Sequence, residues 1–144
     1  MRNAIEHILE RSNEQERFNK LLALTLTDCS REALWAEYTF TVKEWSKNPS
    51  GGVHGGVISS LFDTAMGITA VGLSGMNVTT TDLSVSFVRP MNGETYTYRA
   101  ECSHLGKRML RMTGKAFNAE TGELCATAMA SFMIIGSMEK PLRV

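Results

Sequence analysis

The chain has few cysteines and no signal-like N-terminus. Cys29, Cys102 and Cys125 lie far apart, form no Cys-x-x-Cys pair and have no histidine at metal-ligand spacing, which argues against a zinc site. Reduced thiols are the simpler interpretation, so we predict a cytoplasmic protein. Residues 1–20 carry acids throughout and lack the apolar core of a secretion signal. No metal and no cofactor is expected.

Excess charge of either sign is also lacking: Lys and Arg number 15, and Asp and Glu number 15. There is no polybasic run and no acidic tail, so nucleic acid and anionic membrane surfaces are not expected as partners. No apolar run is expected to reach transmembrane length. A length of 144 residues predicts one domain with a sound core.

Hydrophobic spacing indicates a helical extension at residues 1–23, an α+β domain at 24–136 and a tail at 137–144. The extension has a broken apolar pattern that predicts an accessory docking helix. Alternating apolar residues predict strands at 24–29, 34–42, 78–88, 95–104, 107–117 and 124–135. We expect the last four to form a meander. The final strand is apolar on both faces and is therefore expected to be central and covered on both sides.

One stretch, residues 48–73, organises the rest of the chain. A loop rich in turn formers leads into a helix without proline, expected at about residues 55–73. N–H groups in the first turn of a helix have no partner within it, and the helix dipole favours negative charge or a polarised oxygen there. Asp63 lies two turns further in. Free N–H groups followed by one carboxylate predict a reaction site; the alternative is that Asp63 is a surface acid on a helix.

The side of this helix that carries Asp63 is small rather than charged. The opposite side is an apolar core stripe of Val57, Ile58, Leu61, Ala65, Ile68 and Gly72. Asp63 is accompanied by Ser59, Met66, Gly67 and Ala70. A solvated face would normally carry Lys, Glu or Gln, so this face is expected to meet a substrate or another protein surface.

The loop and helix resemble those of the hot-dog-fold acyl-CoA thioesterases of the phenylacetate-pathway type. The matching residues are Asn48, the run His54-Gly55-Gly56, and Asp63, eight residues after Gly55. The downstream strands LSVSFVRP and TGELCATAMASFMI fit the same pattern. The resemblance implies a hot-dog fold, in which an antiparallel sheet wraps around one long central helix. Relatives with this fold include dehydratases and non-catalytic acyl binders, so the fold alone does not define the chemistry.

The resemblance implies roles for five residues. The Gly55 N–H would bind the thioester carbonyl oxygen and stabilise the oxyanion. Asp63 would be the general base, or the nucleophile that forms a mixed anhydride. Asn48 would position the water or the thioester, and Thr81 would help to orient the water. His54 is an alternative base, although a loop-shaping hydrogen bond is the favoured role.

The resemblance also implies that CoA meets a further set of residues, for which ordinary surface positions are the alternative. The set comprises Gly56, Arg89, Gly106, Lys107 and Arg108. We therefore expect an enzyme that hydrolyses an acyl- or aryl-CoA thioester to the free acid and CoA. The alternatives are a non-catalytic acyl-CoA-binding protein and a dehydratase acting on hydroxyacyl thioesters. The intact catalytic set favours the hydrolase.

The active site is expected to be shared between two subunits. Gly55 and Asp63 are separated by eight residues, or about 12 Å along a helix axis. That is too far for both to act easily on one thioester. Two antiparallel copies would bring Gly55 of one chain to Asp63 of the other, in a homodimer with two identical sites. The resemblance further implies stacking of dimers into a homotetramer.

Overall fold

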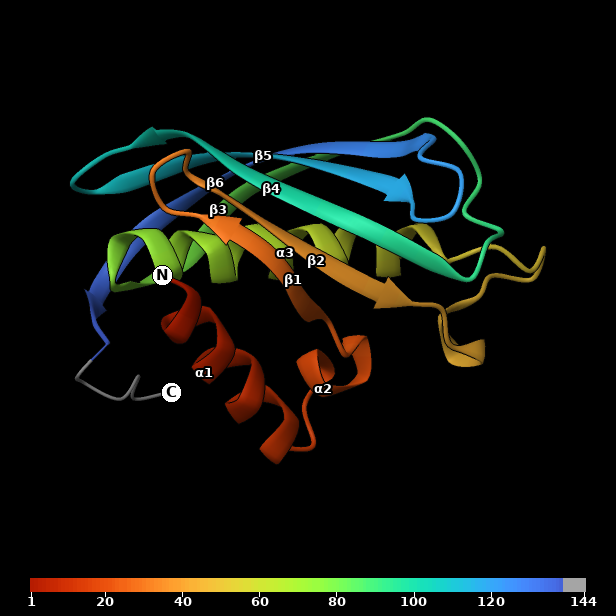
Figure 1. Cartoon of the computed structure of the whole chain (residues 1–144), viewed down its shortest axis with the longest axis horizontal. Coiled ribbons are helices and arrows are strands. Elements are labelled where there is room, and N and C mark those ends of the chain that lie inside the picture. The colour runs from red at the N-terminus through yellow and green to blue at the C-terminus, as the bar shows by residue number, and fades with distance from the viewer. Residues whose placement is uncertain (139–144) are drawn as a thin grey trace.

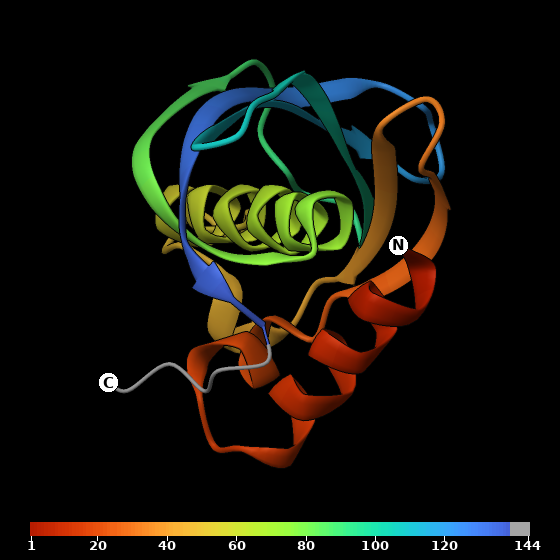
Figure 2. The same cartoon turned by 90° about the vertical axis from the view of Figure 1, so that its left-hand side faces the viewer.

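One antiparallel sheet of six strands curls around one long helix in the computed structural model, which describes residues 1–138 (Figure 1, Figure 2). The strand order is β1-β2-β4-β5-β6-β3. The predicted hot-dog architecture is confirmed. The elements are α1 (Arg2–Glu14), α2 (Phe18–Leu22), β1 (Thr25–Ser30), β2 (Trp35–Thr41), the 3-10 helix η1 (Glu44–Ser46), α3 (Gly55–Ser74), β3 (Met76–Phe87), β4 (Thr95–Leu105), β5 (Met109–Asn118) and β6 (Leu124–Ser137).

The helix α3 lies inside the curve of the sheet, as the end-on view shows (Figure 2). Leu61 of the predicted core stripe is fully buried. Met66 and Ala70 are fully buried within the chain, so the prediction that the face beside Asp63 meets a substrate or another protein surface was wrong for these two positions. The reason is the curvature of the sheet, which covers both flanks of α3; a Cβ at Gly67 would lie only 3.2 Å from Phe132 of β6.

By length and composition α3 would suit a membrane span, contrary to the expectation that no apolar run is long enough. In the structure, 56% of that stretch is buried inside the protein. The core helix of a globular domain passes the same test, because an apolar surface on all sides suits burial against protein as well as lipid.

Alternation predicts the buried faces of the inner strands correctly. Ala36, Tyr38 and Phe40 of β2 are fully buried, as are Tyr96 and Tyr98 of β4. Their side chains point at α3 because successive residues of a strand face opposite sides of the sheet. Burial raises the pKa of Tyr38 and Tyr98 above the usual value, so both hydroxyls stay neutral.

The final strand differs from its prediction. β6 lies between β5 and β3, but its outer face is open, with Met129 63% exposed and Met133 also exposed. Only one face of the sheet meets α3, so an apolar outer face does not imply cover within the chain. The predicted four-strand meander was also wrong: β3 pairs with β6, and of these four strands β4, β5 and β6 alone are joined as consecutive neighbours. Residues 88–94 carry the chain from β3 at the edge to β4 inside the sheet.

The N-terminal helices cover the side of α3 that the sheet leaves open (Figure 2). Ile5 of α1 is fully buried, and a Cβ at Gly72 would lie 2.8 Å from its Cγ1. The close approach of α1 to α3 therefore requires glycine at position 72. The predicted tail overlaps β6 at Ser137, and residues 139–144 of it lie outside the described part of the chain.

Candidate active site

The loop before α3 is held in place largely by its own backbone. The Asn48 side-chain oxygen accepts a hydrogen bond from the Ser50 N–H (2.9 Å), and the Asn48 N–H donates to the Gly52 carbonyl (2.7 Å). The Val53 N–H donates to the Met91 carbonyl (3.0 Å), which ties the loop to the segment that follows β3. This Asx-type turn explains why the sequence has so many turn formers here.

The first two N–H groups of α3 differ: that of Gly56 is engaged, and that of Gly55 is free. His54 is the N-cap residue, and its Nδ1 accepts a hydrogen bond from the Gly56 N–H (2.9 Å). This is the loop-shaping bond that the sequence favoured for His54. It also occupies the N–H of Gly56, which is therefore not available as a donor to CoA. The N–H of Gly55 has no acceptor among residues 1–138, as expected for the first helical position.

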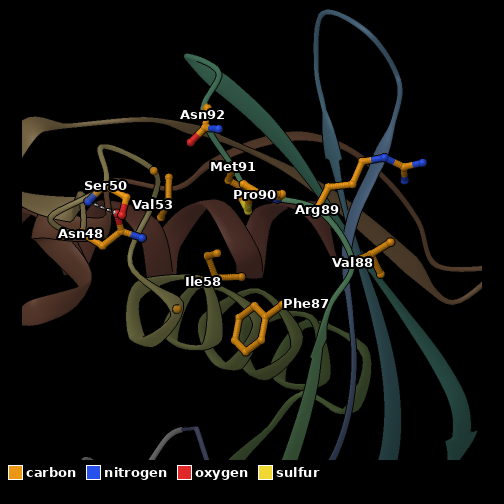
Figure 3. A pocket seen from close by; sticks show the side chains of 12 residues that line it. Asn48, Ser50, Val53, Ile58, Phe87, Val88, Arg89, Pro90, Met91 and Asn92 are labelled. Atoms are coloured by element: carbon orange, nitrogen blue, oxygen red, sulfur yellow. Dashed lines mark hydrogen bonds between the residues drawn. The ribbon is translucent and has the colours of Figure 1, made fainter.

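Gly55 opens into a cleft of about 570 Å³ between the loop, the start of α3 and the end of β3 (Figure 3). Apolar side chains make up half of its lining, and Asn48, Asn92 and Arg89 add polar groups. In Figure 3, Phe87 points from the end of β3 toward the first turn of α3, whereas the Arg89 side chain points away from it. The lining residues are Asn48, Ser50, Gly52, Val53, Gly55, Ile58, Phe87, Val88, Arg89, Pro90, Met91 and Asn92.

Asp63 is partly buried and is held by a residue that the sequence did not single out. The Thr80 hydroxyl donates a hydrogen bond to Asp63 Oδ1 (2.7 Å). The hydroxyl of Thr81 instead contacts Asp82 (3.2 Å) and donates to the Ser131 carbonyl (3.1 Å). Within one chain, Thr81 therefore does not contact Asp63.

A β-bulge explains the exchange of Thr80 for Thr81. The pairing of β3 with β6 shifts between Thr80 and Asp82, which adds one residue to β3 at that point. Leu83 and the following odd-numbered residues face α3, and simple alternation would place Thr81 on the same side. The bulge reverses the alternation, so that Thr80 faces the helix. The apolar side chain of Val78, at an even position, was the signal in the sequence that the alternation changes.

Within one chain the predicted site residues form two groups. Asn48, Gly55 and Arg89 line the cleft, and Asp63 does not. The positions of Gly55 and Asp63 on α3 keep the donor and the carboxylate about 12 Å apart along its axis.

The predicted CoA contacts are divided in the same way. The Arg89 guanidinium donates to the Leu124 carbonyl (2.9 Å), where β6 begins beside the end of β5. Gly106, Lys107 and Arg108 form the turn at the opposite end of β5, about 26 Å away at the usual rise per residue. One chain therefore does not bring Arg89 and this turn to a common phosphate site.

Cys125 lies next to the cleft, where its carbonyl accepts a hydrogen bond from the N–H of Arg89 (3.0 Å). Cys125 is buried, and its burial raises the pKa of the thiol even though Arg89 lies close by. A protonated thiol is a poor nucleophile at neutral pH. In the part of the chain that the structure describes, no three His, Cys, Asp or Glu side chains gather in a way that would hold a metal ion. Asp63 stays the predicted base or nucleophile, with His54 as the alternative base.

The match to a family model shows which protein family this chain belongs to. Residues 50–125, more than half of the chain, match the model of the thioesterase superfamily. The protein belongs to the thioesterase superfamily. The match includes Gly55, Asp63 and Thr80, and it confirms the predicted enzyme class, a thioester hydrolase. No curated protein matches the chain in sequence.

Solved structures of other thioesterase-superfamily proteins have the same fold. The Escherichia coli PaaI protein of the phenylacetic acid degradation operon aligns with a TM-score of 0.80 and 22% identity, over 94% of this chain and 96% of that one. A phenylacetic acid degradation-related protein from Ralstonia eutropha aligns with a TM-score of 0.80 and 22% identity, over 91% of this chain and 99% of that one. A hypothetical thioesterase from Streptococcus pneumoniae, solved with coenzyme A, aligns with a TM-score of 0.67 and 25% identity, over 72% of this chain and 82% of that one.

Proposed function

We propose that this thioesterase-superfamily protein hydrolyses an acyl- or aryl-CoA thioester to the free acid and CoA. The observation that carries the proposal is the N–H of Gly55, which has no acceptor among residues 1–138 and faces a cleft at the start of the helix that also bears Asp63. Coenzyme A bound to the Streptococcus pneumoniae structure supports a CoA ester as the substrate class.

The Gly55 N–H has the geometry to bind the thioester carbonyl oxygen and to stabilise the charge that develops on it. A single donor of this kind is worth roughly 3–4 kcal/mol in other acyl-transfer enzymes. Asp63 has one oxygen bonded to Thr80, and its other oxygen has no partner among the described residues. That oxygen accepts the proton of an attacking water, or itself attacks the carbonyl carbon to form an anhydride that water then cleaves. In both routes the C–S bond breaks and CoA leaves as the thiolate.

We further propose that each active site combines Gly55 of one subunit with Asp63 of another. β3 is an edge strand of 12 residues, and its exposed Leu83 lies along the side of the sheet that has no neighbour in the chain. Pairing of β3 with β3 of a second copy, related by a twofold axis, runs the two α3 helices in opposite directions. The same pairing moves Arg89 of one chain toward the Gly106–Arg108 turn of the other, which supports a phosphate site built from both.

Two further properties belong to the proposal. Stacking of two such dimers into a homotetramer is one. The other is a cytoplasmic location, which is supported by free thiols at Cys29, Cys102 and Cys125.

The test of the activity is incubation with a panel of short, medium and aryl acyl-CoAs and a thiol reagent that reports free CoA. CoA release that depends on Asp63 supports the hydrolase. Binding without turnover would support an acyl-CoA-binding protein, and conversion of a hydroxyacyl-CoA to an enoyl-CoA would support a dehydratase.

The test of the shared site mixes two inactive variants, Asp63→Ala and Gly55→Pro. After subunit exchange, mixed dimers regain one intact site of two, so activity returns. Each variant mixed with itself is the control. Absence of recovery in dimers shown to be mixed, or a fully active monomer, would rule the shared site out.

A further inference from the structure

Phe87 is an aromatic side chain left open to solvent beside the unpaired N–H of Gly55. It is 56% exposed, although it ends β3 on the sheet face that points toward α3. A Cβ at Gly55 would lie 3.4 Å from Phe87 Cζ and 3.6 Å from Cε1, so the edge of the ring rests on Gly55. An exposed aromatic ring over a free backbone donor is a surface that a bound ligand would cover.

The other apolar groups near Gly55 form a fixed floor. Val53, Ile58 and Met91 are each less than 5% exposed, packed into the core and unable to move aside. A carbonyl oxygen bonded to the Gly55 N–H places its carbonyl carbon next to Gly55. The carbonyl carbon carries two further substituents, the α-carbon of the acyl group and the sulfur of CoA. Because the floor and the ring are apolar, the α-carbon is the one that we expect between them.

We propose that Phe87 is a specificity-determining residue that selects acyl groups with an unbranched α-carbon; this rests on the proposed function. A CH₂ group next to the carbonyl fits beside the ring edge. A methyl branch at that carbon adds bulk where the ring already contacts Gly55, and the buried floor residues bound the cleft on its other side. In apolar pockets one such methyl group changes kcat/KM by about 10–200-fold.

The experiment compares butyryl-CoA with its α-branched isomer isobutyryl-CoA. We expect the wild-type protein to prefer butyryl-CoA in kcat/KM by at least about tenfold. Phe87→Ala should bring the two values to within about threefold, and Phe87→Leu should give an intermediate ratio. The matched control is Leu83→Ala, which shortens an exposed side chain on the same face of β3 but does not line the cleft. Its ratio should stay at the wild-type value, even if weaker subunit pairing lowers both rates.

Equal kcat/KM for the two substrates in the wild-type protein would overturn the proposal. So would an unchanged ratio in Phe87→Ala, or a ratio that Leu83→Ala changes as much. If the wild-type protein releases CoA from neither substrate, calorimetric affinities for the same two acyl-CoAs decide about Phe87. The proposed function fails only if no member of the acyl-CoA panel releases CoA. Tighter binding of butyryl-CoA that is lost in Phe87→Ala supports its role, whereas equal affinities or no binding overturn it.

Discussion

The first and third turns of α3 contribute to the proposed reaction by different means. At the first turn the reactive group is the backbone N–H of Gly55, and the His54 cap and a hydrogen-bonded loop hold it in place. At the third turn the reactive group is the side chain of Asp63, which is held by the hydroxyl of Thr80 in β3. The comparison teaches that the position of a backbone donor is set by where the helix begins. A reactive carboxylate instead requires an acidic residue at that position and a hydrogen-bonding neighbour from a distant segment.

The largest effect is expected at the third turn. Asp63→Asn or Asp63→Ala should lower kcat by about 10²–10⁴-fold, because the base or nucleophile is removed. Folding should change little, since Asp63 lies away from the core. Steady-state CoA release and thermal unfolding measure the two effects. The control, Asp82→Asn, makes the same change at an exposed acid of β3. Near wild-type turnover in Asp63→Asn would refute the mechanism, and an unfolded Asp63→Ala would assign a structural role.

At the first turn, removal of the N–H should matter and addition of a side chain should not. Gly55→Pro deletes the donor at the first helical position, where proline is well tolerated, and the extended backbone of His54 suits a following proline. We expect kcat to fall about 10²–10³-fold with α3 intact. Gly55→Ala keeps the N–H, and its Cβ would make only ordinary contact with Phe87, so it should lose less than about tenfold. Equal losses in both variants would show that crowding, not the donor, is responsible.

The support of Asp63 is expected to have a smaller effect. Thr80→Val removes the hydroxyl that orients the carboxylate and should lower kcat about tenfold, the lower end for a hydrogen bond to a charged group. Thr81→Val removes the neighbouring hydroxyl, which bonds elsewhere, and should change kcat less than about twofold. Measuring kcat for both variants in the same assay separates the roles of the two hydroxyls. A larger loss in Thr81→Val would return the water-orienting role to Thr81.

The smallest effect is expected at the cap of the first turn. His54→Asn retains a side-chain acceptor for the Gly56 N–H, and asparagine is a good N-cap, so kcat should fall by only a fewfold. The loss should stay below that of Asp63→Asn in the same assay. The reverse order would make His54 the base and would reopen the dehydratase alternative.

Local patterns were sufficient for much of the fold. The turn formers after Asn48 and the uninterrupted apolar run after Gly55 predicted the loop and the extent of α3 to within one residue at its end. Alternation identified the buried face of β2 and most of that of β4. The resemblance of the Asn48, Gly55 and Asp63 pattern to thioesterases pointed to a superfamily that the family model then confirmed.

Other features depend on contacts between distant segments. The sequence did not reveal that β3 leaves its chain neighbour β4 and pairs with β6, because pairing follows from how the whole sheet closes around α3. The family resemblance pointed to Thr81, whereas Thr80 contacts Asp63 within the chain, because a bulge that depends on the partner strand reverses the alternation of β3. The sequence also did not decide which apolar faces are covered: Met66 is buried under the sheet, whereas Met129 is exposed.

By itself the sequence determined which groups are chemically able to act: an N–H without a partner at a helix start, a carboxylate two turns later and a loop that presents the first of them. Helical and strand periodicities are properties of neighbouring residues, so a single chain expresses them directly. Only the tertiary structure decided that Thr80 holds Asp63, that Phe87 stands over Gly55, and that the two halves of the site lie apart within one chain. These are relations between segments far apart in sequence, and they arise from the packing of a curved sheet around a helix.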